Sequence, residues 1–259
     1  MGKVVIRNVA FGEGTPKVCA PIVGRTAEEI LAQAEQLNGL PVDAAEWRAD
    51  WMGAVMDDRA VLDVLKKLRK AIGDMPLLMT FRTKNEGGEQ DISRDNYEHL
   101  YELAINSGYI DMLDLELMFF RECEDRARNL IRKAHFRNIC VIMSSHDFHA
   151  TPDKEEILGR LRHMEKLQAD ILKIAVMPCR RRDVLTLLSA TEQMASETEC
   201  PLVTMSMGGL GLISRLSGEI FGSAMTFGAV GRASAPGQID VCRLKDILSE
   251  IHRNMPDKQ

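Results

Sequence analysis

The sequence predicts an α/β protein of the (β/α)8 class, also called the TIM barrel. Eight apolar, β-branched runs recur along its 259 residues, and amphipathic helical stretches lie between them. No Pro-, Gly- or Ser-rich linker interrupts this alternation. Eight such units, spaced about 20 to 35 residues apart, match the usual length of about 250 residues for one barrel. A doubly wound open sheet is the alternative, but it does not use eight similar units so evenly.

The chain is expected to form one domain over residues 1–259. Residues 1–16 alternate weakly in polarity, which predicts a β-hairpin that closes the N-terminal mouth of the barrel. The barrel itself is expected over residues 17–253. Its eight strands are predicted at residues 17–23, 42–50, 76–82, 111–117, 138–145, 170–176, 201–207 and 224–230.

Helix signals occupy the connections between the predicted strands. Polar N-caps, Gly stops and an apolar helical stripe are all present. The signals are Thr26 with Glu29, Asp57 or Asp58 with Gly73 as the stop, Ser93 with Gly108 as the stop, Thr151 with Pro152 as N-cap and first residue, and Leu244, Leu248 and Ile251 in the last helix.

Composition excludes several classes of function. The formal charge of -5 and the pI of about 5.8 give no basic surface for nucleic acid. No apolar run approaches the roughly 20 residues that span a bilayer, and the first residues lack a signal peptide, so no membrane partner and a cytoplasmic location are expected. The six cysteines are scattered, which disfavours disulfides and zinc. His146 and His149 flank Asp147 without a further ligand at a suitable spacing, so no metal is expected.

One lysine interrupts a strand that is otherwise apolar. The stretch DILKIAVMP places Lys173 among residues typical of a strand covered on both faces. A buried ammonium costs several kcal/mol, roughly, unless it is paired or loses its proton. Strand alternation puts other polar side chains on the same inner faces: Glu46 with Arg48, Thr80 with Arg82, Asp114 with Glu116, and Ser144 with His146.

Polar side chains from five strands at one mouth indicate a polar ligand. Any one of these polar side chains, taken alone, is more often part of an internal ion pair or a hydrogen-bonded core residue. Asp114 and Glu116 are expected to neutralise nearby arginines, and it is the convergence of all the side chains that indicates a ligand. A lysine in a dry lumen near Arg48, Arg82 and Arg215 is disfavoured as an ammonium, which predicts a free amine. Such an amine attacks a ketone or aldehyde and forms an iminium, an electron sink that needs no cofactor.

His146 lies on the adjacent predicted strand and is a candidate general acid and base. Glu86, in the loop TKNEGGEQ, is a candidate to fix the imidazole tautomer, although a loop glutamate is usually only solvated. Two later loops are candidate anion-binding or lid elements. TMSMGGLGLISR carries Arg215 but no dinucleotide fingerprint, and GRASAPGQID carries Ser234 and Gln238, which an ordinary turn also explains.

Six motifs together resemble one family, the type I 3-dehydroquinate dehydratases of the shikimate pathway. In order and in spacing they are EWRADW, TFRTKNEGGE, SSHDF, LKIAVM, TMSMGGLGLISR and SAPGQI, and the resemblance runs from about residue 17 to residue 253.

The resemblance implies dehydration of 3-dehydroquinate to 3-dehydroshikimate through a Schiff base on Lys173, without a cofactor. It implies that His146 acts as general acid and base and that Glu86 orients it. Substrate binding is implied for Glu46, Arg48, Arg82, Arg215, Ser234 and Gln238, with Met205 and Phe227 as packing walls. It further implies a homodimer and a lid formed by the loop with Ser234 and Gln238.

Two other functions are compatible with parts of this pattern. A class I aldolase or transaldolase also uses a strand lysine and an iminium but breaks a carbon–carbon bond, and the six motifs together disfavour it. A non-catalytic binding barrel is the other alternative, although binding alone does not require a buried amine beside a histidine.

Overall fold

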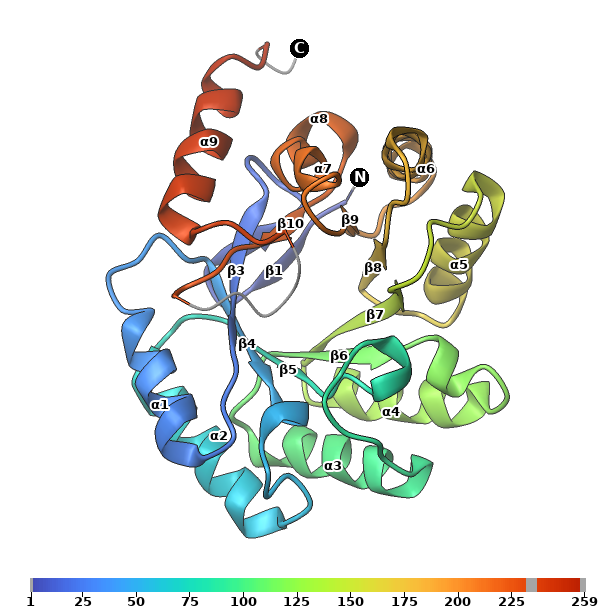
Figure 1. Ribbon diagram of the computed structural model, residues 1–259. Coiled ribbons are helices and arrows are strands. Elements are labelled where there is room, and N and C mark those ends of the chain that lie inside the picture. Colours follow the sequence, from blue (N-terminus) through green and yellow to red (C-terminus); the bar gives the residue numbers. More distant parts are fainter. Residues whose placement is uncertain (1, 232–236, 257–259) are drawn as a thin grey trace.

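The chain folds into a barrel of parallel strands surrounded by helices (Figure 1). The structure is a computed structural model, and it describes residues 2–231 and 237–256. Within these ranges the eight-stranded sheet has the order β10-β3-β4-β5-β6-β7-β8-β9, and β1 and β2 form a separate antiparallel pair. The predicted α/β barrel is therefore confirmed.

The strands lie close to their predicted positions. The hairpin consists of β1 (Val4–Ile6) and β2 (Val9–Phe11). The barrel strands are β3 (Lys17–Ile22), β4 (Ala44–Arg48), β5 (Leu77–Thr80), β6 (Met112–Glu116), β7 (Cys140–Asp147), β8 (Ile171–Val176), β9 (Leu202–Ser206) and β10 (Met225–Phe227).

The helices connect these strands and form the outer layer. They are α1 (Ala27–Gln36), α2 (Asp58–Ile72), α3 (Arg94–Ser107), α4 (Glu124–Phe136), α5 (Lys154–Lys166), α6 (Arg181–Glu197), α7 (Leu212–Leu216), α8 (Gly218–Phe221) and α9 (Val241–Arg253). Short 3-10 helices follow three strands: η1 (Ala49–Trp51), η2 (Lys84–Glu86) and η3 (Met118–Phe120). In the described part of the chain, no helix is both long and apolar enough to cross a bilayer.

The first and last strands of the sheet meet and close the barrel. Leu202 bridges to Ser223, just before β10, and the Leu202 carbonyl accepts a 2.7 Å hydrogen bond from the Ala224 amide. On its other side β10 pairs in parallel with β3. This closure excludes the open doubly wound sheet, because an open sheet leaves two free edges.

Strand alternation divides the apolar core into two layers. In β8, Leu172, Ile174 and Val176 pack outward against the helices. Ile171 and Ala175, on the same face as Lys173, pack inside the barrel. The expected inner and outer faces of this strand are confirmed.

The hairpin closes the N-terminal end of the lumen. Ile6 and Phe11 belong to the inner apolar layer, together with Cys19 and Ala44 at the start of the barrel strands. Arg7, between the two hairpin strands, pairs with Asp111 at 2.7 Å. These contacts confirm the position expected for the hairpin.

Most predicted helix starts are confirmed. The side chains of Thr26, Asp57 and Ser93 each accept a hydrogen bond from a backbone amide in the first turn of α1, α2 and α3. The prediction of Thr151 and Pro152 as the start of the next helix is wrong.

Asp153 caps α5 instead, and its carboxylate accepts a hydrogen bond from the Glu156 amide at 2.9 Å. The Thr151 hydroxyl donates to the Met177 carbonyl at 3.1 Å, beyond the end of β8. Because the Thr151 hydroxyl is hydrogen-bonded to this strand end, it does not cap the helix, and Asp153 does so instead.

We predict that Phe11→Ala destabilises the protein by about 3 to 5 kcal/mol, because its ring is fully buried under the lumen. Urea unfolding followed by circular dichroism measures this change. Val5→Ala is the matched control in the same hairpin, since Val5 is 59% exposed, and it should change stability by less than about 0.5 kcal/mol. Equal effects of the two substitutions would contradict the packing of Phe11 described above.

Candidate active site

A polar cavity of about 220 Å³ lies at the carboxyl ends of the barrel strands. Every candidate residue except Ser234 lines it, and Ser234 lies outside the described residues. The cavity-lining candidates are Glu46, Arg48, Arg82, Glu86, His146, Lys173, Met205, Arg215, Phe227 and Gln238. The lining also includes Trp51, Phe148 and Met207, which the sequence analysis did not identify. The inner faces of the strands bring some of these residues to the cavity, whereas Glu86, Arg215 and Gln238 reach it from η2, from α7 and from the segment before α9.

Lys173 projects from β8 into the base of this cavity and is only 3% exposed. Its Nζ lies 2.8 Å from Oδ2 of Asp114, 3.7 Å from Oε1 of Glu46, and 4.7 Å from the centre of the Phe227 ring. The sequence predicted mainly cations around this amine. The structure adds carboxylates at contact distance, because the inner faces of β4 and β6 carry Glu46 and Asp114 to the same level of the lumen.

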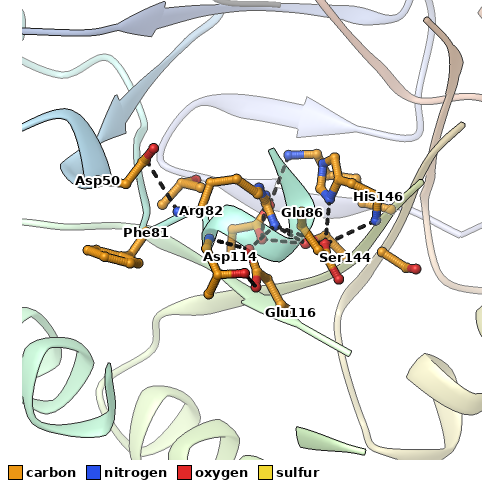
Figure 2. Close-up of polar contacts among 12 residues, drawn as sticks. Asp50, Phe81, Arg82, Glu86, Asp114, Glu116, Ser144 and His146 are labelled. Atoms are coloured by element: carbon orange, nitrogen blue, oxygen red, sulfur yellow. Dashed lines mark hydrogen bonds and ion pairs between the residues drawn. The ribbon is translucent and has the colours of Figure 1, made fainter. Parts of the chain in front are cut away.

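Arg82 connects two buried carboxylates, Asp114 and Glu116, at the floor of the lumen beneath the cavity (Figure 2). Its guanidinium lies 2.9 Å from Oδ1 of Asp114 and 2.9 Å from Oε1 of Glu116, and it donates to the Ser144 hydroxyl at 2.9 Å. The expected neutralisation of arginine by Asp114 and Glu116 is therefore present.

These contacts determine the charge of the floor. Burial opposes ionisation of Asp114, but Arg82 and Lys173 outweigh it and hold the pKa of this carboxyl well below its usual value. Burial likewise disfavours the Arg82 cation, yet Asp114 and Glu116 raise the pKa of its guanidinium. The floor thus holds ionised partners in contact with one another.

Glu86 and His146 form a second pair at the side of the cavity (Figure 2). Oε2 of Glu86 accepts a hydrogen bond from the His146 amide at 3.0 Å and lies 2.9 Å from Nδ1 of the imidazole. Burial, followed by the charges of Arg82 and Lys173, lowers the pKa of His146 well below 6.5. Burial and the charge of Glu116 raise the pKa of Glu86 well above 4.5. The neutral imidazole is therefore the favoured form near neutral pH.

Two glycines shape the loop that carries Glu86. Gly87 ends η2 with φ +83, and a Cβ there would overlap the Phe148 ring. A Cβ on Gly88 would overlap the Arg82 carbonyl. Thr83 anchors the same loop, since its hydroxyl donates to Glu116 at 2.7 Å. This tight turn buries Glu86, which explains why a loop glutamate is not solvated here.

Asp50 is a further buried carboxylate beside the site, and it was not among the predicted site residues. It accepts two 2.8 Å hydrogen bonds from the Arg48 guanidinium and one from the Glu89 amide at 3.2 Å. Its position two residues after Arg48 is the sequence signal that would have identified it. Asp50 therefore fixes the direction of Arg48 and ties the loop with Glu86 to β4.

Arg215 extends from α7 into the same cavity. It is almost completely buried, and Nη1 lies 3.6 Å from the sulfur of Met205. Burial lowers the pKa of its guanidinium to about 10, so it is a cation at neutral pH. A buried cation that lines a cavity attracts an anionic group of a ligand.

The stretch with His146 and His149 has a structural explanation of its own. Asp147 accepts hydrogen bonds from the amides of His149 and Ala150 at 3.0 and 2.9 Å, which forms a turn after β7. Within residues 2–231 and 237–256, no group of three or more potential ligands is arranged to hold a metal ion.

The fold and the cavity define a (β/α)8-barrel enzyme with its site at the carboxyl ends of the strands. Residues 18–255 match the family model for type I 3-dehydroquinase. The chain belongs to this family, whose members are hydro-lyases. The aldolase-type and non-catalytic alternatives are therefore set aside.

Named relatives are similar to this protein over nearly the whole length of the chain. The chain is 49% identical over 253 residues to a 3-dehydroquinate dehydratase of Listeria monocytogenes serotype 4b, covering 98% of this chain and 99% of that protein. A crystal structure of the type I enzyme from Clostridium difficile with covalent modified comenic acid has a TM-score of 0.95 and 45% identity, covering 98% of this chain and 100% of the other. The enzyme from Geobacillus kaustophilus has a TM-score of 0.95 and 38% identity, with 98% of each chain covered.

We predict that the His146 imidazole titrates below pH 6.5 in the folded protein, since burial and nearby cations disfavour its charged form. The unfolded chain then takes up this proton first as the pH falls through 6.5, so His146 lowers the free energy of unfolding in that range. A pH series of 15N spectra measures the titration, and the signal lost in His146→Asn identifies the residue. Titration at or above pH 6.5 would contradict this environment.

Proposed function

We propose that the chain converts 3-dehydroquinate to 3-dehydroshikimate and water through a Schiff base on Lys173, as a step of the shikimate pathway. The observation that carries the proposal is a buried amine at the base of a polar cavity that also contains a histidine paired with a buried glutamate. Family membership supports the substrate and the overall reaction. The side-chain arrangement supports the individual steps below.

In the first step the neutral amine of Lys173 attacks the ketone carbon. A C–N bond forms, water leaves, and the nitrogen becomes a positively charged iminium. The iminium withdraws electrons from the adjacent C2, which makes its proton removable. Imine formation and elimination each release one water, and hydrolysis of the product imine consumes one. The net reaction releases a single water.

His146 moves the protons in this scheme. Nδ1 lies 2.9 Å from Oε2 of Glu86, and in this scheme it donates to that oxygen, so that Nε2 keeps a free electron pair. Nε2 takes the C2 proton and then returns a proton to the C1 hydroxyl, which leaves as water. Because the imidazole is neutral in this environment, it starts the cycle as a base. Glu86 holds the ring in one tautomer and stabilises its charged form after proton uptake.

The remaining candidates bind the substrate. A carboxylate is attracted to the buried guanidinium of Arg215, and ring hydroxyls fit the donors and acceptors around the cavity. In this assignment the polar contacts come from Glu46, Arg48, Arg82, Ser234 and Gln238, and the apolar walls from Met205 and Phe227. The lid expected from the loop with Ser234 falls mainly on residues 232–236, which lie outside the described residues. We also propose that the reaction uses no cofactor and that the enzyme is a cytoplasmic homodimer.

We predict that borohydride reduction in the presence of 3-dehydroquinate leaves a covalent adduct on Lys173, because borohydride reduces an iminium to a stable amine. Peptide mass spectrometry locates the adduct. Lys173→Ala should abolish both the adduct and turnover, whereas Lys67→Ala, an exposed lysine on α2, should retain both. An unmodified Lys173 in the native enzyme would exclude the scheme.

His146→Ala should still form the imine but lose turnover by about 10²- to 10⁴-fold, because amine attack needs only Lys173 while elimination needs proton transfer. Steady-state kinetics and borohydride trapping on the same samples separate the two steps. His149→Ala is the control, since this neighbouring histidine is exposed and does not line the cavity. Normal turnover in His146→Ala would remove this residue from the mechanism.

A further inference from the structure

A carboxylate that does not line the cavity lies directly beneath the lysine. Asp114, on β6, is completely buried, and its Oδ2 lies 2.8 Å from Nζ of Lys173. Its other oxygen is 2.9 Å from Nη2 of Arg82 and accepts a 2.5 Å hydrogen bond from the Ser144 hydroxyl. Because both oxygens are occupied and neither faces the cavity, Asp114 acts on a substrate only through Lys173.

The position of Asp114 is fixed by its surroundings. Its backbone carbonyl accepts a 2.5 Å hydrogen bond from the Tyr101 hydroxyl of α3, and this hydroxyl in turn accepts a 2.9 Å hydrogen bond from the Phe81 amide. Ser144 lies on the neighbouring strand β7, and Arg82 follows β5 on the other side. The carboxylate is therefore held from three elements and presents Oδ2 to the amine in a defined direction.

The charge on the lysine nitrogen alternates during a Schiff-base reaction. The ammonium, the substrate iminium and the product iminium are cations, whereas the free amine and the enamine are neutral. A fixed negative charge in a water-poor site stabilises the cationic forms relative to the neutral ones. Asp114 is the carboxylate nearest to this nitrogen, and Glu46 is farther away at 3.7 Å.

We propose that Asp114 is a positioning residue that holds Nζ of Lys173 and stabilises the cationic forms of its nitrogen, an inference that rests on the proposed Schiff-base function. When the amine attacks, the C–N bond forms, water leaves, and the positive charge develops beside Oδ2. Loss of the C2 proton to His146 then gives the neutral enamine. The electron pair of the enamine then expels the C1 hydroxyl, which His146 protonates so that it leaves as water. The nitrogen thereby regains its positive charge beside the same carboxylate.

Other charged groups surround this pair and contribute to its titration. They come from every element packed against it, so a change in one of them would shift the same equilibrium. The groups are Cys19 on β3, Glu46 and Arg48 on β4, Arg82 after β5, Glu86 on η2, Tyr101 on α3, Glu116 on β6, His146 on β7 and Arg215 on α7.

The test is Asp114→Asn, which keeps the shape of the side chain but removes its charge. Acetic anhydride modifies only the neutral amine, so the pH dependence of Lys173 acetylation reports how strongly the cation is favoured. In Asp114→Asn we expect the midpoint to move to lower pH by about one unit or more. We also expect less adduct in borohydride trapping and a kcat about 10- to 1000-fold lower.

Asp111→Asn is the matched control, one residue before the strand that carries Asp114. Asp111 is likewise an ion-paired carboxylate, although only partly buried, and its partners are Arg7 and Arg69 at the opposite end of the barrel. It should leave the acetylation midpoint of Lys173 unchanged. An Asp114→Asn variant that loses activity without a shift of the midpoint would overturn the proposal, since distortion alone lowers activity in that way.

A milder variant tests the same charge if Asp114→Asn does not fold. Ser144→Ala removes the hydroxyl that shares the charge of Asp114, which leaves more negative charge on Oδ2, so the midpoint should move to higher pH. No movement, or movement to lower pH, would overturn the proposal. The acetylation experiments need no substrate, whereas the native borohydride adduct tests the Schiff base, so the two proposals fail separately.

Discussion

The ion pairs at the floor of the lumen are the interaction on which the site depends. Arg82 contacts Asp114 and Glu116, and Asp114 contacts Lys173, so none of these buried charges lies alone. Removing one member leaves another charge buried without compensation, which typically costs about 3 to 5 kcal/mol. The barrel supplies the excellent geometry that such pairs require, because parallel strands in register bring alternate side chains to one level. The ion pairs that stabilise the core of the barrel are therefore the same contacts that position Lys173 for the proposed reaction.

Two pairs of groups divide the chemistry of the cavity. Lys173 has the carboxylates of Asp114 and Glu46 at 2.8 and 3.7 Å from its nitrogen, whereas burial and nearby cations keep the His146 ring neutral. The nucleophile and the base of the proposed reaction therefore lie in different electrostatic surroundings. The glycine turn after η2 maintains this division, because it brings Glu86 to the imidazole rather than to solvent.

Much of the fold and of the cavity could be predicted from the sequence. Continuous β-branched runs specified the strands, and their two-residue period placed Lys173 and Glu46 inside the barrel. The contact between Lys173 and Asp114 could not be predicted, because these residues lie on β8 and β6, with β7 between them, and their distance depends on the curvature of the closed sheet. The burial of Glu86 could not be predicted from the sequence pattern, because it depends on the tight turn of its loop. The start of α5 was predicted wrongly, because the Thr151 hydroxyl donates to the Met177 carbonyl instead of capping the helix.

The apolar hairpin beneath the lumen has a consequence for the traffic of small molecules. Ile6 and Phe11 fill the end of the barrel opposite the cavity, so that end is a plug of packed side chains rather than a passage. A ligand therefore enters and leaves through the same mouth, at the carboxyl ends of the strands. A product has to dissociate before the next substrate binds, and a segment that covers this mouth controls both binding and release.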